Sequence, residues 1–536
     1  MSEAWWKKAV VYQIYPKSFQ DTNGDGIGDI RGIIQRLPYL KKLGIDAIWL
    51  SPMYVSPQYD NGYDIADYYH IQKEYGTMDE MKALIENAHH LNIKIIMDLV
   101  VNHTSYLHSW FQEAKKSKES PYHDYYVWRP ADQGVPNELT SVFGGSAWEY
   151  NEATDEYYLH LFAKEQPDLN WENEKMRQEI YKMMNYWLDL GIDGFRMDVI
   201  DLIGKDPDRQ ITANGPKLHE LIKEMHQATL SGRDVMTVGE TWSATPEIAR
   251  QFSSEKEKEL SMVFQFEHIG LDQEEGKSKW ESIPLDRIAF KQVFDKWQNA
   301  LQDEGWNSLF LNNHDLPRMV SRFGDDGKYR VKSAKMLATL LHLQKGTPYI
   351  YQGEEIGLTN TTVSSIDEVD DIESRQFYEE YVSSWGEEKT LAAINKKGRD
   401  NARRPIPWTK EGGFSTGAPW LALNKHYKEI NVEAALDDSD SIFYYYQALI
   451  RLRHQHDLVV YGDFYDVLPE HPDIYMFKRS YKGEEWLVVC NLSDHMVNDT
   501  PAMKVKEIIL SNDCASNLDT TQFNPYEAVI YRCENE

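Results

Sequence analysis

Two charged side chains in one strand-like segment are the first groups in this sequence that could do chemistry. The segment is GFRMDVI, in which apolar residues alternate with Arg196 and Asp198. Side chains two residues apart on a strand share a face, so these two point the same way. A neighbouring guanidinium lowers the pKa of a carboxyl and keeps it ionised, which suits a carboxylate nucleophile and does not suit a general acid. The same pair could also be a structural ion pair that closes a strand.

Other strand-like segments also end in groups that can act on a substrate. His103 ends one of them, Glu240 ends the segment VMTVGE, and His314 and Asp315 end NSLFLNNHD. In a barrel of parallel strands the carboxyl ends of the strands meet on one side and carry the active site. This recurrence favours a shared site over an isolated structural ion pair.

The elements that would position these groups alternate between two patterns. Amphipathic helical patterns with a period near 3.6 cover residues 30–44, 78–92, 174–191 and 332–346, and several of them end at Gly or Asn. Apolar strand-like segments lie at residues 10–16, 46–52, 93–103, 194–200, 235–241, 261–267, 307–315 and 347–355. Eight alternations predict an α/β protein with a closed (β/α)8 TIM barrel.

Two insertions and a C-terminal unit complete the predicted organisation. The region after the third strand is rich in aromatic and polar residues, and long βα loops of this kind commonly build a substrate pocket. From about residue 458 short alternating segments indicate a small β-sandwich. We therefore expect a barrel over 1–103 and 172–457, an inserted domain over 104–171, a subdomain after strand eight over 356–415, and a C-terminal β-sandwich over 458–536.

Composition restricts the partners. The formal net charge of -29 argues against nucleic acid and against an anionic membrane, because both are bound by clustered Lys and Arg. A neutral small molecule is the expected ligand. The cysteines show no metal-ligand spacing, no apolar segment is long enough to span a bilayer, and the N-terminus lacks signal-peptide features. We expect free thiols and a cytoplasmic monomer.

Four motifs in a fixed order carry a family resemblance. With DLVVNH, GFRMDVI, GETWS and NNHDLPR at the ends of strands three, four, five and seven, the whole chain resembles the α-amylase superfamily of glycoside hydrolases. The segments DNGYDI and QPDLN are similar to the branch of oligo-1,6-glucosidases and dextran glucosidases, also called glucan 1,6-α-glucosidases. The resemblance implies a retaining, exo-acting α-glucosidase that removes α-glucose from the non-reducing end of α-1,6-linked isomaltooligosaccharides and dextran.

The resemblance assigns three carboxylates. Retaining glycosidases use two carboxyl groups about 5 to 5.5 Å apart, one as nucleophile and one as general acid and base. Asp198 matches the nucleophile and Glu240 the acid and base, and desolvation beside Trp242 would favour the protonated form that an acid needs. Asp315 matches the third family carboxylate, which binds the sugar 2- and 3-hydroxyls.

The same resemblance implies a pocket for one glucose. Asp60 would pair with Arg399, or alternatively with Arg403, and close the pocket behind the terminal sugar. Lys279 and Glu373 match contacts on the leaving-group side, although each could also be a solvated surface charge. The full set of implied substrate-binding residues is Asp60, Tyr63, His103, Phe143, Phe162, Gln166, Arg196, Val199, Trp242, Lys279, His314, Glu373 and Arg399, with Asp98 and Asn102 as supports.

Two positions bear on specificity within the family. Members that act on α-1,6 bonds carry Val after the nucleophile, as Val199 does here, whereas those that act on α-1,4 bonds tend to carry Ala or Thr. A methyl group changes rates by about 1–3 kcal/mol, so this implies a preference and not exclusivity. Segment 201–213 is short, whereas oligo-1,6-glucosidases that prefer short substrates carry a longer insertion at this place. A shorter loop should leave the leaving-group side of the site open to longer glucans.

An acidic loop, DTNGDGIGD, indicates a calcium site away from the chemistry. Oxygen ligands follow alternate spacing, with Gly26 at the turn, as in a calcium loop. It is not an EF-hand, because Gly32 stands where the bidentate Glu would be. The family resemblance also places Ca2+ here, and a hydrated acidic loop is the alternative. The implied ligands are Asp21, Asn23, Asp25, the backbone carbonyl of Ile27, and Asp29.

Three other functions remain open. Trehalose-6-phosphate hydrolases and sucrose isomerases share this framework, and Leu285, Asp286 and Arg287 partly match the RLDRD signature of the isomerases. A basic cluster for a phosphate is not visible in the linear sequence but could assemble in three dimensions. Non-catalytic transporter partners of this fold lose the carboxylates and carry a membrane anchor, and neither feature is found here.

Overall fold

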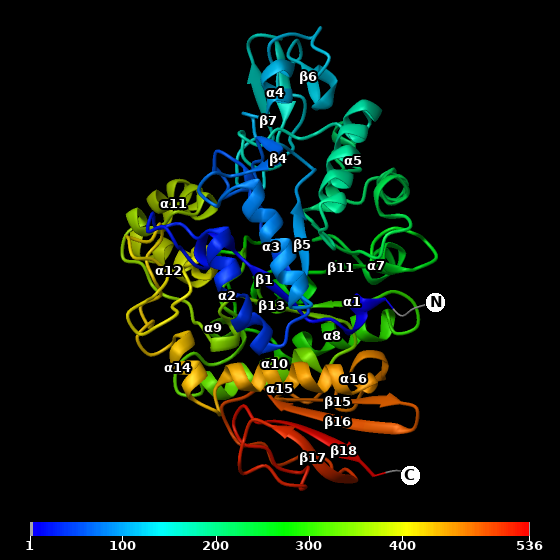
Figure 1. The fold of residues 1–536 in the computed structure, drawn as a ribbon, viewed down its shortest axis with the longest axis vertical. Helices are drawn as coiled ribbons and strands as arrows, with labels where there is room; N and C mark the ends of the chain where they lie inside the picture. Colours follow the sequence, from blue (N-terminus) through cyan, green and yellow to red (C-terminus); the bar gives the residue numbers. More distant parts are fainter. Residues whose placement is uncertain (1–3, 535–536) are drawn as a thin grey trace.

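Eight short parallel strands stand side by side at the centre of the computed structural model, which describes residues 4–534 (Figure 1). They pair in the order β11-β10-β9-β5-β2-β1-β13-β12, and a parallel bridge between Val263 and Asn307 joins the two ends of this order. The predicted TIM barrel is therefore confirmed. The strands are β1 (Val11–Ile14), β2 (Ala47–Leu50), β5 (Lys94–Leu99), β9 (Gly194–Met197), β10 (Met236–Glu240), β11 (Met262–Phe264), β12 (Ser308–Leu309) and β13 (Thr347–Tyr351).

The strands are short and buried because helices cover the outside of the barrel. Every residue of β1, β2, β9, β10 and β13 is buried, as expected for parallel strands enclosed on both faces. The predicted segments are longer than the strands, since each continues into a loop at the carboxyl end. His103, Asp198, His314 and Asp315 lie in these loops, whereas Glu240 is the last residue of β10.

The barrel helices begin and end where the sequence provides caps. Asp29 accepts a hydrogen bond from Gly32 N at the start of α2 (Ile30–Leu43), and Gly44 ends that helix in the left-handed region at φ 103°. Thr77 and Glu80 form a capping box at the start of α3 (Met78–His90). The other barrel helices are α5 (Glu174–Asp189), α6 (Leu218–Met225), α7 (Pro246–Ser253), α8 (Arg287–Ala300), α10 (Arg330–His342) and α15 (Ile442–Gln455).

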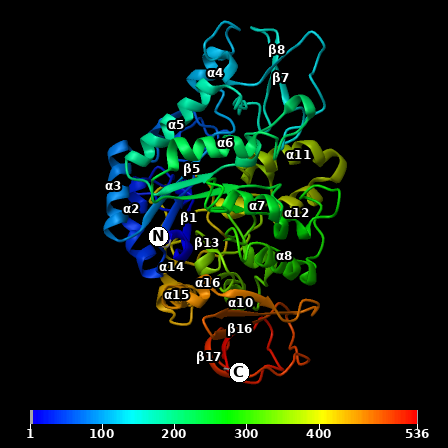
Figure 2. The same ribbon diagram turned by 90° about the vertical axis from the view of Figure 1, so that its right-hand side faces the viewer.

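Two excursions rise above the carboxyl ends of the strands. The first carries α4 (Ser109–Ala114) and an antiparallel sheet of β6 (Trp128–Pro130), β8 (Glu156–Leu159) and β7 (Trp148–Asn151), and lies at the top of Figures 1 and 2. The second carries α11 (Ile372–Trp385), α12 (Glu387–Lys397) and α13 (Asp400–Arg403) around a small core that includes Phe377, Leu391 and Ile394. A short hairpin of β3 (Tyr54–Val55) and β4 (Asp67–Ile71) lies between β2 and α3.

The C-terminal unit is antiparallel, as predicted, but its described strands form one sheet where a two-sheet sandwich was expected. The order is β14-β15-β16-β18-β17. One face, with Phe477 and Val488, joins the barrel core below α10 and α16 (Asp457–Tyr461), and the opposite face, with Met476, packs under loops. Barrel helices cover the first face and loops cover the second, so neither face needs a second sheet to bury it. The strands are β14 (Asp463–Asp466), β15 (Ile474–Tyr481), β16 (Glu484–Asn491), β17 (Val505–Ser511) and β18 (Ala528–Cys533).

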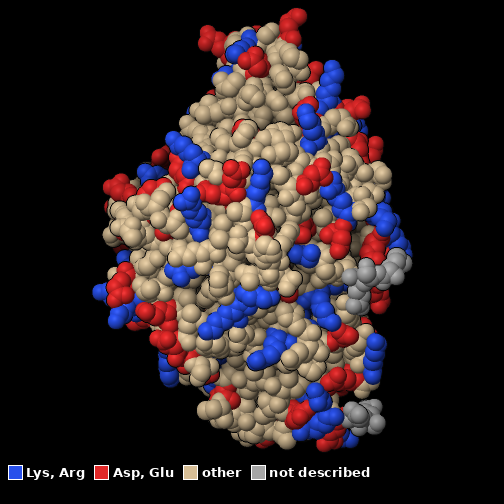
Figure 3. All heavy atoms as spheres, in the orientation of Figure 1, with Lys and Arg blue, Asp and Glu red and all other residues tan. Residues whose placement is uncertain are grey.

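The cysteines and the charged side chains lie where the composition leads one to expect them. The three cysteines form no disulfide, and Cys514 is exposed while Cys490 and Cys533 are buried. Asp and Glu side chains are spread over the face drawn in Figure 3, and several Lys and Arg side chains lie together below its centre. Among residues 4–534, no helix is both long and apolar enough to cross a bilayer.

Candidate active site

A cavity of about 800 Å³ opens at the carboxyl ends of the barrel strands. It brings together side chains from the ends of β9, β10 and β12 with others from both excursions. Most of the predicted site residues line it, although they are scattered over more than 300 positions of the chain. These are Asp60, Tyr63, His103, Phe143, Phe162, Asp198, Val199, Glu240, Trp242, Lys279, Asp315, Glu373 and Arg399.

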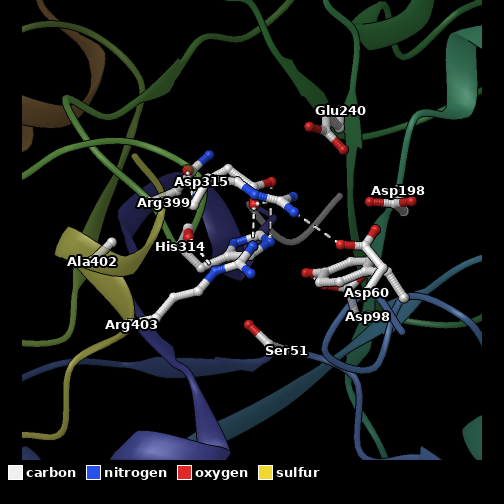
Figure 4. A network of polar contacts seen from close by, with 12 residues as sticks. Ser51, Asp60, Asp98, Asp198, Glu240, His314, Asp315, Arg399, Ala402 and Arg403 are labelled. Carbon is white, nitrogen blue, oxygen red and sulfur yellow. Dashed lines mark hydrogen bonds and ion pairs between the residues drawn. The ribbon is translucent and has the colours of Figure 1, made fainter. Parts of the chain in front are cut away.

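One buried guanidinium holds the two predicted catalytic carboxyls. Arg196 Nη1 donates to Asp198 Oδ1 at 2.7 Å, and Arg196 Nη2 donates to Glu240 Oε2 at 2.6 Å. The same Nη1 also reaches Asp98 Oδ1 at 3.0 Å. Because Arg196 is 1% exposed, it lies beneath the cavity and orients the carboxyls without lining the cavity wall. Figure 4 shows Asp198 and Glu240 on the same side of the site.

The electrostatic state of Asp198 differs from the sequence-based expectation. Burial raises the pKa of the Asp198 carboxyl well above its ordinary value, Arg196 opposes that rise, and the nearby Glu240 adds to it. The expectation of a lowered pKa is wrong because it considered the guanidinium and neglected desolvation. Arg196 is shared with Asp98 and Glu240, so its charge does not offset the burial of Asp198. Asp198 and Glu240 are nevertheless held by one guanidinium.

A turn directly after β9 places the backbone against Glu240. Val199 has a left-handed conformation with φ 35°, and its N–H donates to Glu240 Oε2 at 3.1 Å. The strand ends at Met197, so the expected alternation stops before Val199. A β-branched residue at positive φ is unfavourable and marks a functional constraint. Trp242 Nε1 donates to the other oxygen, Glu240 Oε1, at 2.9 Å, so both oxygens of this carboxyl are oriented.

Asp315 lies beside two arginines and a histidine on the opposite side of the cavity. Arg403 Nη2 donates to Asp315 Oδ1 at 2.7 Å and Arg399 Nη1 to the same atom at 3.3 Å, while His314 Nε2 lies 3.3 Å from Oδ2. Burial alone would raise the pKa of Asp315, but His314, Arg399 and Arg403 together lower it below its ordinary value. Asp315 is therefore anionic and suited to accept hydrogen bonds from hydroxyl groups.

His314 and Gln166 lie behind the cavity wall. Gln13 Nε2 lies 2.8 Å from His314 Nδ1, and the imidazole stacks on the Tyr63 ring at 5.1 Å and 6°. Burial lowers the pKa of His314 to about 3, so the ring is neutral. Gln166 Nε2 donates to Asp60 Oδ2 at 3.1 Å and to Tyr63 O at 3.0 Å. Both side chains are fully buried, so they position wall residues and do not themselves face the cavity.

An ion pair forms one wall of the cavity. Arg399 Nη2 donates to Asp60 Oδ1 at 3.0 Å, whereas Arg403 contacts Asp315. Of the two arginines left open by the sequence, Arg399 is the partner of Asp60. Arg399 Nε also donates to Asp371 Oδ1 at 2.8 Å. The dashed contacts in Figure 4 show how Arg399 links Asp60 to the Asp315 side of the site.

Aromatic side chains form the rest of this wall. Phe143 and Phe162 meet edge to face at 5.8 Å, and the Arg399 guanidinium lies 5.3 Å from the Phe143 ring centre. Burial lowers the pKa of His103 to about 4, and its Nε2 lies 2.9 Å from Tyr63 O. Carboxylates, one guanidinium and apolar rings in one small space are the mixture that recognises a sugar, whose hydroxyls are polar and whose ring faces are apolar.

Comparisons with known proteins agree with this geometry. Residues 13–462 match the family model described as the catalytic domain of alpha amylase. The chain belongs to the α-amylase family. It is 52% identical to an oligo-1,6-glucosidase of Parageobacillus thermoglucosidasius, with 99% of each chain covered. It is 54% identical to a glucan 1,6-alpha-glucosidase of Streptococcus pneumoniae, with 98% of this chain and 99% of the relative covered.

A solved structure of the family has the same architecture. The trehalose-6-phosphate hydrolase of Bacillus licheniformis aligns with a TM-score of 0.95 at 45% identity, over 99% of this chain and 100% of that one. This α-amylase family member is therefore a glycoside hydrolase with the family barrel. Relatives of more than one specificity lie within this range of similarity.

Several residues of the family site were not predicted from the sequence. Asp371 accepts from Arg399 Nε and is also the N-cap of α11. Phe266 stacks on the half-exposed Trp242 at 3.8 Å, and its place in an alternating strand segment could have indicated it. Asp201 is 1% exposed, lines the cavity and has an Oδ1 without a hydrogen-bond partner among the described residues. Burial raises the pKa of Asp201 to about 7.

The predicted leaving-side residues form an ion pair. Lys279 Nζ donates to Glu373 Oε2, and both side chains line the cavity of this family member. The pair connects the loop after η6 (Glu267–Asp272) to the start of α11. They are not independent solvated charges, because each is partly buried against the other.

The predicted calcium loop forms a tight turn. Asp21 accepts hydrogen bonds from the N–H groups of Asn23, Gly24 and Gly26, and Asp29 accepts from Thr22 and Gly32. Ser415 also donates to Asp21 at 2.5 Å. Within residues 4–534, no three His, Cys, Asp or Glu side chains converge in a metal-binding arrangement. The loop oxygens are thus largely engaged with protein N–H and O–H groups, and calcium stays a prediction.

Proposed function

We propose that this α-amylase family member is a retaining, exo-acting α-glucosidase that hydrolyses α-1,6 bonds at the non-reducing end of isomaltooligosaccharides and dextran. The observation that carries the proposal is the Asp60–Arg399 pair beside the Asp198–Glu240 pair in one cavity. The relatives named oligo-1,6-glucosidase and glucan 1,6-alpha-glucosidase support the linkage.

The first chemical step follows from the positions of the two carboxyls. Asp198 attacks the anomeric carbon while Glu240 donates its proton to the leaving oxygen, so the glycosidic bond breaks as the bond to Asp198 forms. Arg196 donates to both carboxyls, so its charge stabilises the anionic form of Asp198 before attack and that of Glu240 after it has given up its proton. Val199 N and Trp242 Nε1 keep the Glu240 oxygens oriented.

The second step reverses the roles. Glu240, now ionised, removes a proton from water as that water attacks the anomeric carbon, and the ester bond to Asp198 breaks. Two inversions at the same carbon give net retention, so the released glucose has the α configuration. Asp315, kept anionic by its cationic neighbours, accepts hydrogen bonds from the sugar hydroxyls during both steps.

The exo mode follows from the Asp60–Arg399 wall. Both side chains are less than 8% exposed, so the wall is a buried ion pair that a longer chain would have to break. Both residues line the cavity, where their charged groups suit the hydroxyls of a terminal glucose. A glucan would therefore enter with its non-reducing end against this wall.

A substrate panel tests the proposal. Isomaltotriose, maltotriose, trehalose 6-phosphate and sucrose are incubated with the enzyme, and the anomer of the released glucose is followed by NMR. We expect the fastest release from isomaltotriose, with α-glucose as the first anomer. Release of β-glucose would refute the double displacement, and hydrolysis that persists in Asp198→Asn would refute the nucleophile. No hydrolysis of any of the four substrates by the unmodified protein would favour a non-catalytic binding role.

One observation favours trehalose 6-phosphate as a second candidate substrate. Arg322 and Lys397 line the same cavity and share the buried Asp272, at 2.7 and 2.6 Å. Two cations on one carboxylate leave a net positive charge that could attract a phosphate. Trehalose 6-phosphate hydrolysed at least tenfold faster than isomaltotriose would establish this alternative. Formation of isomaltulose from sucrose would instead establish a sucrose isomerase.

A further inference from the structure

A second cavity, of about 480 Å³, lies where the inserted sheet meets the loop that follows the nucleophile. The loop begins with η3 (Ile200–Leu202), immediately after Asp198 and Val199. Arg129 of β6 holds it through two bonds to Asp208, at 2.7 and 2.9 Å, and Asn137 Nδ2 donates to Pro207 O at 2.8 Å. The cavity is thus enclosed by two parts of the chain that are fixed to each other.

A buried ammonium lines this cavity. The side chain of Lys205 is 4% exposed, and its ion-pair partner Asp168 Oδ2 lies at 3.3 Å. Within the described residues, no acceptor meets hydrogen-bond geometry with Lys205 Nζ. A buried charge that lacks hydrogen bonds is costly, so oxygen acceptors inside the cavity would stabilise the folded protein. Lys205 supplies the donor side of a site.

Acceptors line the same cavity. Glu156 is 8% exposed, and its Oε2 lies 3.0 Å from His123 Nε2. His123 Nδ1 donates to Ala114 O at 2.8 Å, which fixes the ring beside Glu156. The contact with His123 Nε2 does not meet hydrogen-bond geometry, and Glu156 Oε2 has no hydrogen-bond partner among the described residues. A buried carboxylate oxygen is thus available to accept a hydrogen bond from a ligand.

The cavity also has aromatic walls and a mouth of mixed charge. His123 stacks on Trp128 at 4.7 Å and 12°, and both line the cavity. Lys118, Asp124 and Glu172 are exposed lining residues and mark where it reaches solvent. Acids beside the cations would repel an anion, and the buried Lys205 would repel a cation. A neutral ligand with both donors and acceptors fits this lining.

We propose that this cavity is a second carbohydrate site that binds a glucosyl unit of an isomaltooligosaccharide or dextran chain. Hydroxyl groups both donate and accept, so one sugar can satisfy Lys205 and Glu156, which line the same cavity. The volume lies within the range of about 300–1,000 Å³ that is typical of small-molecule sites. The ligand class rests on the proposed function, because the same glucan serves both cavities.

Binding to a catalytically inactive variant tests the second site. Isomaltotriose is titrated into Asp198→Asn by calorimetry, and crystals of that variant are soaked with the same sugar. We expect two binding sites, with density in the barrel cavity and density beside Lys205 and Glu156. Adding Lys205→Met or Glu156→Gln should weaken the second site at least tenfold, and adding Lys175→Met, an exposed lysine on α5, should not.

The possible results separate the two proposals. One calorimetric site in every variant, with only ordered water in the second cavity, would overturn the second site and leave the proposed function intact. Density there without a second calorimetric site would mean binding at crystal concentration only, and would overturn it as well. An empty barrel cavity with no isomaltotriose hydrolysis by the unmodified enzyme would instead refute the proposed function. Melting curves establish folding, and Glu156→Gln replaces Lys205→Met if that variant is unstable.

Discussion

Replacing Asp60 by asparagine tests the wall that makes the enzyme exo-acting. The change keeps the shape of the side chain and removes its charge. Asp60 accepts from Arg399 at 3.0 Å and from Gln166 at 3.1 Å, and it lines the cavity with 5% exposure. In the proposed complex it also accepts from a hydroxyl of the terminal glucose. Loss of one hydrogen bond to a charged group costs about 1.5–3 kcal/mol, which is about 10- to 150-fold in kcat/KM.

The fold should tolerate this substitution. Arg399 keeps Asp371 at 2.7 Å and Asp315 at 3.3 Å, so its charge is not left without a partner. Burial raises the pKa of Asp60, which means that its charged form is itself unfavourable in this position. We therefore expect the free energy of unfolding to change by less than about 2 kcal/mol, well below the loss seen when a buried charge loses its only partner.

The assay compares kcat/KM for isomaltotriose and for a longer isomaltooligosaccharide, with melting temperature as the test of folding. Asp370→Asn is the matched control, because Asp370 is exposed, accepts from Asn61 at 3.2 Å and does not line the cavity. We expect a drop of at least tenfold for Asp60→Asn on both substrates and less than a twofold change for the control. A correctly folded Asp60→Asn enzyme with unchanged kcat/KM would refute the role of this wall.

Three further predictions concern linkage, pH and metal. Val199→Ala should shift the ratio of kcat/KM for isomaltose over maltose toward maltose by about 10- to 200-fold, and an unchanged ratio would remove Val199 from linkage preference. Folding raises the pKa of Asp201 to about 7, so the folded protein binds this proton more tightly and stability is lost as pH rises from about 4 to about 7. Asp201→Asn should therefore raise the free energy of unfolding at pH 7.5 by about 2–4 kcal/mol, which is measured as a higher melting temperature, and should have little effect at pH 4. An equal effect at both pH values would contradict this. Calcium at 100 times its dissociation constant should stabilise the protein by about 2.7 kcal/mol relative to a chelator, and equal melting curves with and without calcium, or a rise that persists in Asp25→Asn, would refute the loop as its site.

The sequence by itself determined the barrel and its functional end. The eight alternations predicted eight strands because a buried parallel strand must be apolar along its length, and such segments stand out from the amphipathic helices between them. Polar residues at the ends of those segments then had to meet on one side of the barrel. The order of the motifs that contain Asp198, Glu240 and Asp315 was sufficient to indicate the family.

Only the tertiary structure decided how these groups interact. Asp60 and Arg399 are 339 positions apart, and nothing in the local spacing distinguishes Arg399 from Arg403 as the partner. The pKa of Asp198 could not be read from its arginine neighbour, because desolvation depends on everything that covers the site. The cavity beside Lys205 was likewise invisible in the sequence. Periodicity along a chain fixes which face a side chain occupies, whereas ion pairs, burial and cavities arise between segments that only folding brings together.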